Sequence, residues 1–125
     1  MALTRDFRQT VQARAKRDPA FRRGLLGEAI ESLLSGEVAL GKELLRDYIN
    51  ATVGFPKLSA HTEMNVKTLH QMFGPRGNPT SSKLFGIVAY LQRAEGVHFR
   101  LRPAHTSYAK QHRPSARTRR PASTA

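Results

Sequence analysis

Residues 54–96 read GFPKLSAHTEMNVKTLHQMFGPRGNPTSSKLFGIVAYLQRAEG and contain the signals that decide the fold. Pro56 suits the first turn of a short helix over 56–61, because its missing N–H would have no helical partner there in any case. Asn65 is a favourable N-cap for a second short helix over 66–73, which a glycine ends. The two helices are therefore expected to meet across a tight turn.

Apolar residues in this stretch are spaced to form one compact core. Four of them would hold the two short helices at the steep crossing of a helix-turn-helix. They are Leu58, Met64, Leu69 and Phe73. A third helix is expected to begin near Thr80 or Ser81, directly after a proline. Its buried face would consist of Leu84, Ile87, Val88 and Leu91.

Residues 1–52 are expected to form an N-terminal helical segment followed by a helical hairpin. Apolar side chains at four-residue spacing predict a first helix over 4–16. An aspartate N-cap with proline at the next position begins a second helix, which runs from Asp18 to Gly36. A third helix follows over 38–50, and the short connection makes these two helices antiparallel neighbours.

Charge restricts the classes of partner. The chain has 125 residues, with 21 Lys or Arg against 9 Asp or Glu, and its formal net charge is +12. Such an excess attracts polyanions, so nucleic acid is the first partner class to consider. The absence of cysteine excludes disulfides and thiolate nucleophiles. The longest apolar run, 84–91, is far shorter than the roughly 20 residues of a spanning helix, so we expect a cytoplasmic protein with no membrane partner.

Residues 103–125 contain five basic and no acidic side chains, and they lack valine, leucine, isoleucine and phenylalanine. Such a segment cannot bury enough apolar surface to offset the entropy of ordering, so we expect a disordered basic tail. Two interpretations are open for it. The tail either keeps the protein soluble or adds sequence-independent DNA affinity through phosphate contacts.

Five of the nine acidic residues lie on the expected hairpin, which is therefore the part of the chain least suited to contact phosphate. They are Glu28, Glu31, Glu37, Glu43 and Asp47. They form either an ordinary solvated helix face or a protein-docking surface that binds a partner by charge complementarity.

Three strings carry a resemblance to a known family: LTRDFRQTVQARAKRDPAFRRGLL, AIESLLSGEVALGKELLRDYI and MFGPRGNPT. The chain resembles the Xre/Cro family of helix-turn-helix DNA-binding proteins, and more closely the HigA-like antidotes of toxin–antitoxin modules and prophage DNA-binding proteins. The resemblance implies an all-α fold in which N-terminal helices precede a lambda-repressor-like helix-turn-helix region over 53–102. The chain departs from the pattern at Glu63, where most members place glycine in a left-handed turn.

Motif position in this family implies which side chains would contact double-stranded DNA. Bases would be read by Val66, Lys67 and Gln71, with Asn65 and His70 at the margins. Lysine can donate to guanine, glutamine can pair with adenine, and valine can pack on a thymine methyl group. Phosphates would be contacted by Thr68, Lys57, Arg76, Asn78 and Lys83. Three neighbouring apolar residues are expected in the core instead: Leu69, Met72 and Phe73.

Other chemistry has little support in the sequence. The five histidines show no metal-ligand spacing, and the carboxylates have surface spacing without a nearby base, so we expect no metal, cofactor or enzymatic activity. Residues 97–101 alternate apolar and polar side chains as a short strand would. A lone strand needs a partner, and pairing with a second copy would suit a homodimer on a palindromic operator.

The expected function is that of a sequence-specific transcriptional repressor that is also the antitoxin of a toxin–antitoxin operon, with the cognate toxin as its protein partner. Two alternatives stay open at this point. One is a protein-interaction module with an incidental basic surface, and the other is a nonspecific nucleic-acid binder without operator specificity.

Overall fold

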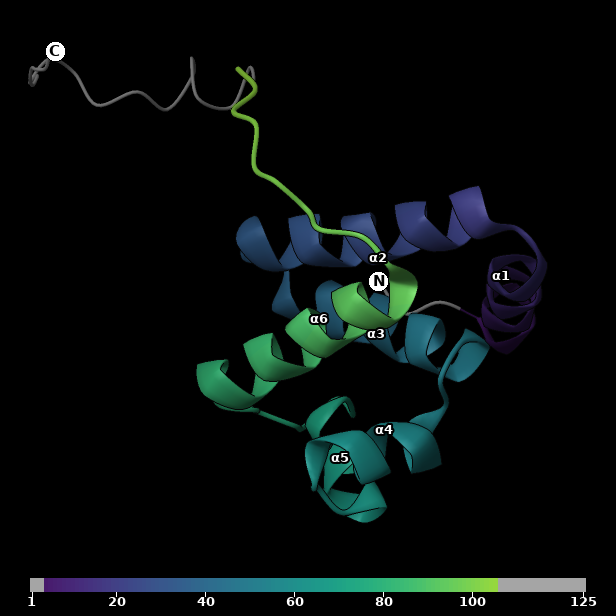
Figure 1. Cartoon of the computed structure of the whole chain (residues 1–125), viewed down its shortest axis with the longest axis vertical. Helices are drawn as coiled ribbons and strands as arrows, with labels where there is room; N and C mark the ends of the chain where they lie inside the picture. The colour runs from purple at the N-terminus through teal and green to yellow at the C-terminus, as the bar shows by residue number, and fades with distance from the viewer. Residues whose placement is uncertain (1–3, 106–125) are drawn as a thin grey trace, which may run out of the picture.

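A computed structural model of the chain describes residues 4–105. This part of the chain is all-α, as predicted, and forms six helices (Figure 1). They are α1 (Arg5–Arg17), α2 (Pro19–Leu34), α3 (Val38–Ala51), α4 (Phe55–Thr62), α5 (Val66–Met72) and α6 (Ser81–Glu95). All six lie within a few residues of the ranges expected from the sequence.

Side-chain caps explain where four of the helices begin. The Thr4 hydroxyl accepts a hydrogen bond from the Phe7 N–H at 3.1 Å, and a carboxylate oxygen of Asp18 accepts one from the Phe21 N–H at 3.1 Å. The remaining two caps are Asn65 at α5 and Thr80 at α6. Each satisfies one of the backbone donors that a helix start leaves without an intrahelical partner, and the predicted N-caps at Asp18 and Asn65 are confirmed.

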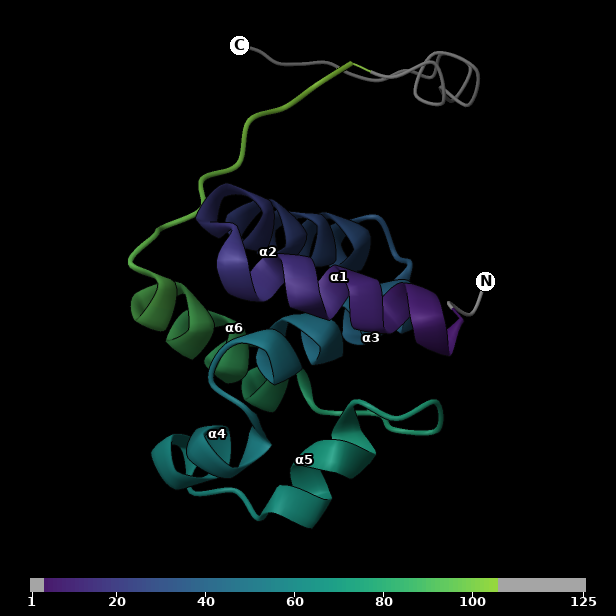
Figure 2. The same ribbon diagram turned by 90° about the vertical axis from the view of Figure 1, so that its right-hand side faces the viewer.

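The α1 and α2 helices lie toward one end of the molecule, and α4 and α5 lie at the other (Figure 2). After a short connection α3 turns back beneath α2, so that these two helices form the predicted hairpin (Figure 1). Their approach is close at Gly41, where a Cβ atom would lie 2.7 Å from Cδ2 of Leu33. The α3 and α6 helices lie between the two ends.

One apolar core joins all six helices. The predicted face of α6 is buried, and so are Leu58 of α4, Leu69 of α5 and Phe73. Met72 is buried as well, whereas Met64 in the α4–α5 turn is only partly buried against this core. The α4–α5 pair is therefore held on α6 and α3 by the apolar side chains that the sequence pattern indicated.

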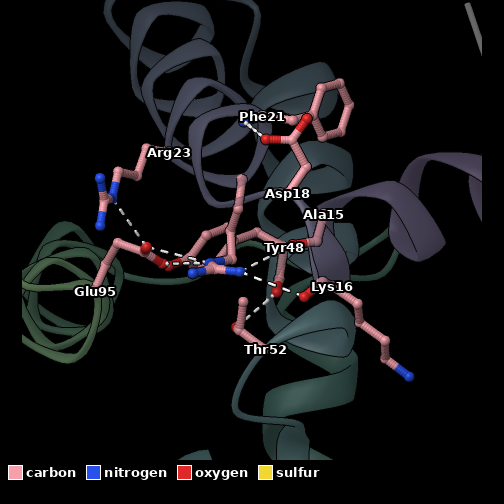
Figure 3. A network of polar contacts seen from close by, with 9 residues as sticks. Ala15, Lys16, Asp18, Phe21, Arg23, Tyr48, Thr52 and Glu95 are labelled. Atoms are coloured by element: carbon pink, nitrogen blue, oxygen red, sulfur yellow. Dashed lines mark hydrogen bonds and ion pairs between the residues drawn. The ribbon is translucent and has the colours of Figure 1, made fainter.

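A polar network joins α6 to the N-terminal helices (Figure 3). The Glu95 carboxylate, whose side chain is only 5% exposed, pairs with Nε of Arg22 at 3.0 Å and with Nε of Arg23 at 3.3 Å. Arg22 also donates to the carbonyl oxygen of Ala15 at 3.1 Å. The last turn of α6 is thereby fixed against the end of α1 and the start of α2.

The strand expected over 97–101 is not formed within this chain, since 97–105 have no regular secondary structure. No strand in the described part of the chain is available to pair with it. The N–H of Phe99 instead donates to Oε1 of Gln92 at 2.9 Å, and the Phe99 ring packs against Gly27 of α2. Of the predicted basic tail, 103–105 are irregular and exposed, and 106–125 lie outside the described residues.

Candidate nucleic-acid interface

The turn between α4 and α5 depends on a left-handed backbone at Glu63, where φ is 59° and ψ is 27°. Its N–H donates to the carbonyl oxygen of Ser59 at 2.9 Å and closes the end of α4. Ser59 in turn donates through its hydroxyl to the carbonyl oxygen of Met64. A residue with a Cβ atom adopts this conformation at a cost of about 1 kcal/mol, so Glu63 accepts strain that glycine would avoid.

The outward face of α5 is polar and its inward face is apolar. Lys67, His70 and Gln71 are exposed, whereas Leu69 and Met72 are buried. Because residues four apart lie one above the other on a helix, Lys67 and Gln71 project from the same stripe. The helix therefore presents two long hydrogen-bonding side chains side by side on its solvent face.

The margins of this face are held in place by neighbouring groups. The His70 ring packs on Phe55 of α4, with 4.3 Å between the ring centroids. Asn65 is exposed, and its side-chain oxygen caps α5 by accepting from the Thr68 N–H at 3.2 Å. Val66 and Thr68 are each only partly exposed. Asn65 and His70 are therefore exposed but held by contacts within the protein, and Val66 and Thr68 are partly covered.

A pocket of about 630 Å³ opens beside this face, between the end of α5, the loop that follows it and the first turn of α6. It brings together half of the residues predicted to contact DNA: Thr68, Gln71, Arg76, Asn78 and Lys83. Among the described residues no carboxylate lines it, so Arg76 and Lys83 make it electropositive. Lys57 is exposed on α4 and does not line the pocket.

Sequence analysis overlooked Lys42, which holds the loop behind this pocket. Its side chain is 6% exposed, and its Nζ donates to the carbonyl oxygens of Gly74 at 3.1 Å and Gly77 at 2.6 Å. A signal was present in the sequence. Lys42 lies three residues before Leu45 and seven before Ile49, on the stripe of α3 that the apolar spacing assigns to the core.

The predicted acidic surface is only partly formed. Glu28, Glu31 and Glu37 are exposed, whereas Glu43 is partly buried. Asp47 is fully buried, and its Oδ1 accepts from Nε2 of Gln12 at 2.8 Å and from Nε of Arg8 at 3.3 Å.

The inclusion of Asp47 in a docking surface was therefore wrong. The physical reason is that α1 packs over this side of α3 and brings Arg8 and Gln12 onto the carboxylate. Asp47 is a structural partner of α1, and only the three exposed glutamates are placed to meet another molecule.

Comparison with protein-family models, with curated proteins and with solved structures gives no match for this chain. Within residues 4–105 no cluster of histidine, aspartate and glutamate could hold a metal ion. The helices in the same range are all too short or too polar to cross a membrane. The geometry of the chain itself is therefore the basis for assigning a function.

Proposed function

We propose that the protein is a sequence-specific transcriptional regulator that binds double-stranded DNA with α4 and α5 acting as a helix-turn-helix. The observation that carries this proposal is the exposed stripe of Lys67 and Gln71 on α5, directly beside the electropositive pocket that contains Arg76 and Lys83. The major groove of B-form DNA is wide enough to admit an α-helix such as α5. The chain's charge of +12 favours the same partner.

In this arrangement the two parts of the interface have different roles. Lys67 and Gln71 reach base edges, where lysine donates to guanine and glutamine pairs with adenine. Arg76, Asn78 and Lys83 contact phosphate oxygens, which orient the helix but carry no sequence information. The protein acts as a homodimer on a palindromic operator, the arrangement that most regulators of this type use.

A second role follows from the N-terminal half. The exposed Glu28, Glu31 and Glu37 lie on α2 and at the start of α3, at the opposite end of the molecule from α5 (Figures 1 and 2). A basic protein partner could thus bind while DNA is held, as an antitoxin and autorepressor in the cytoplasm requires. The two alternatives are a protein-interaction module and a nonspecific nucleic-acid binder. Selection of duplexes from a randomised pool distinguishes both from a sequence-specific regulator.

The test is to select duplexes from a randomised pool with the full chain and then to measure affinity for the selected duplex and for a shuffled one. At about 0.15 M salt, we expect the selected duplex to bind at least about 1,000-fold more tightly. If a dimer neutralises about six phosphates, the slope of log K against log salt should be about −5. Equal affinity for both duplexes would exclude a specific regulator and leave a nonspecific binder, whereas binding to neither would leave the protein-interaction module.

A further inference from the structure

The loop over 74–80 follows α5 and carries Arg76 and Asn78 into the electropositive pocket. It contains two glycines that approach α5 closely. The Gly74 N–H donates to the carbonyl oxygen of Gln71 at 3.2 Å, and the Gly77 N–H donates to the carbonyl oxygen of Gly74 at 3.1 Å. The loop therefore folds back on the end of the helix instead of extending away from it.

Gly77 could not carry a side chain in this position. A Cβ atom there would lie 2.0 Å from the carbonyl oxygen of Gln71 and 2.4 Å from that of Met72. These contacts are with backbone atoms, which cannot rotate away as a flexible side chain could. The close contact holds the backbone of the loop against the last turn of α5. It thereby fixes the position from which the side chain of Arg76, the residue before Gly77, projects.

The ammonium group of Lys42 secures this arrangement from the other side. It reaches from α3 to the carbonyl oxygens of Gly74 and Gly77, which flank Arg76 in the sequence. A nearby guanidinium, that of Arg46, also donates to the carbonyl oxygen of Phe73 at 3.5 Å. Two cations of α3 therefore bind the backbone at the point where α5 ends and the loop begins.

Because Lys42 is buried, its hydrogen bonds to the loop contribute to the stability of the loop conformation. An ammonium group removed from water requires hydrogen-bond acceptors, and without them its desolvation is costly. Two loop carbonyls supply acceptors here. An ammonium group covered by the loop without these two acceptors would be buried and unsatisfied, so its hydrogen bonds to Gly74 and Gly77 stabilise the closed loop.

We propose that Lys42 is a positioning residue for DNA binding: it orders the loop over 74–80 and so places Arg76 beside Gln71 on the DNA-facing side. This inference rests on the proposed function. Lys42 itself does not contact DNA, because its ammonium group is buried behind the loop. Its effect passes through the two carbonyl oxygens that it holds.

The first test needs no DNA. Lys42→Met keeps an unbranched side chain of similar length but removes the three N–H donors. Lys16→Met on the exposed surface of α1 is the matched control, because it makes the same change of charge far from the loop. We expect ¹⁵N relaxation to show loop order parameters that fall from about 0.85 to below about 0.6 in Lys42→Met alone.

The second test uses the selected duplex and a double-mutant cycle. In the wild-type background Arg76→Ala should weaken affinity about tenfold. In the Lys42→Met background it should weaken affinity by less than about twofold, because Arg76 is already misplaced. A role of Lys42 in stability alone would lower the melting temperature but leave the full Arg76 effect in both backgrounds.

The outcomes separate the two proposals. An ordered loop in Lys42→Met, or an undiminished Arg76 effect there, would overturn the positioning role. Failure of the wild type to select a duplex would refute the proposed function, while the relaxation measurement would still decide whether Lys42 orders the loop. If Lys42→Met does not fold, Lys42→Gln replaces it, since glutamine keeps a polar group but is shorter and has two amide N–H donors in place of the three of the ammonium group.

Discussion

The hydroxyl of Tyr48 on α3 donates a hydrogen bond to the carboxylate of Glu95 in the last turn of α6. The same carboxylate accepts from Arg22 of α2, whose guanidinium also binds the end of α1. One buried carboxylate thus connects four helices. Since α6 begins at the edge of the electropositive pocket and ends at Glu95, the network sets the direction of a helix that frames the candidate DNA interface.

Replacing this carboxylate should destabilise the fold. Glu95→Gln preserves the shape of the side chain but removes the charge that Arg22 and Arg23 face, so the free energy of unfolding should fall by about 2 kcal/mol at neutral pH. Urea denaturation measures the change. The same substitution at the exposed Glu31 is the control, and its effect should stay within about 0.5 kcal/mol. Equal effects at both positions would contradict a stabilising role for the network.

The effect of Glu95 should also depend on pH. Burial disfavours the charged form, but the hydrogen bonds from Tyr48 and Arg22 outweigh it, so the pKa of Glu95 lies below its ordinary value of 4.5 in the folded protein. A group with a lowered pKa contributes stability above its unfolded-state pKa and loses it as the pH falls through the folded-state pKa. The stability difference between wild type and Glu95→Gln should therefore shrink as the pH falls below 4.5. A difference that stayed constant would argue against the ion pairs.

Glu63 offers a site where stability should increase. Its left-handed backbone is easy for glycine, so Glu63→Gly should raise the free energy of unfolding by about 1 kcal/mol. Glu63→Ala is the matched control, because it removes the carboxylate but keeps the Cβ atom that causes the strain. Thermal and urea denaturation compare the variants. If alanine stabilised the protein as much as glycine, removal of the charge near the end of α4 would be the cause instead.

Sequence signals were sufficient wherever the determinant is local. Asp18 and Asn65 cap helices as their side chains suggested, because a cap needs only the next three residues of the chain. The same holds for the polar and apolar faces of α5. Apolar spacing assigned Leu69 to the core, where it lies, and Lys67, which the resemblance placed on the outer face, is exposed.

Features that depend on packing between distant elements could not be predicted in the same way. Lys42 lies on the stripe of α3 that the apolar spacing assigns to the core, but its acceptors in the loop after α5 could not be read from the sequence. Asp47 is buried because α1 covers it, and no local pattern indicates that contact. The strand expected over 97–101 is not formed within this chain for a related reason. Alternating apolar and polar residues predict which side chains share a face of a strand, but a strand is formed only when its backbone pairs with a second strand. Here the Phe99 N–H donates to the Gln92 side chain instead.

Substitutions should separate the reading of bases by α5 from the nonspecific electrostatic attraction between the protein and DNA. Lys67→Ala and Gln71→Ala should each cost about 1 to 3 kcal/mol of affinity on the selected duplex and much less on a shuffled one, because only a cognate base pairs with these side chains. Lys57→Ala is the contrasting variant, since removing a side chain that binds phosphate should weaken both duplexes alike. Fluorescence anisotropy gives the affinities. Uniform losses of affinity in all three variants would mean that α5 does not read bases.

The basic C-terminal segment should contribute affinity without specificity. Deleting 103–125 removes five positive charges, so binding to selected and shuffled duplexes should weaken equally, and the salt slope should fall by about 1 for each phosphate that the segment neutralises in the full chain. A full-length variant with glutamine at its five basic positions separates charge from chain length. These positions are Lys110, Arg113, Arg117, Arg119 and Arg120. Unchanged affinity and slope would leave the segment a solubilising role alone.

Under the proposed antitoxin role, the exposed glutamates should steer the association of a basic protein partner. Reversing Glu28, Glu31 and Glu37 to lysine should slow association about tenfold at low salt, because complementary charge raises the encounter rate more than the final affinity. DNA binding should persist or strengthen, since the change adds positive charge at the end of the molecule remote from α5. Stopped-flow association with the product of the adjacent gene measures the rate.

Two controls make this last prediction specific. The difference in rate should vanish at about 1 M salt, where charges more than about 3 Å apart are screened. Asp47→Lys should behave differently, because it breaks the buried contacts with Arg8 and Gln12 and should cost about 3 to 5 kcal/mol of folding stability. Unchanged association in the triple variant would exclude the three glutamates as the encounter surface and move the partner site to another face, such as the arginine-rich outer side of α1.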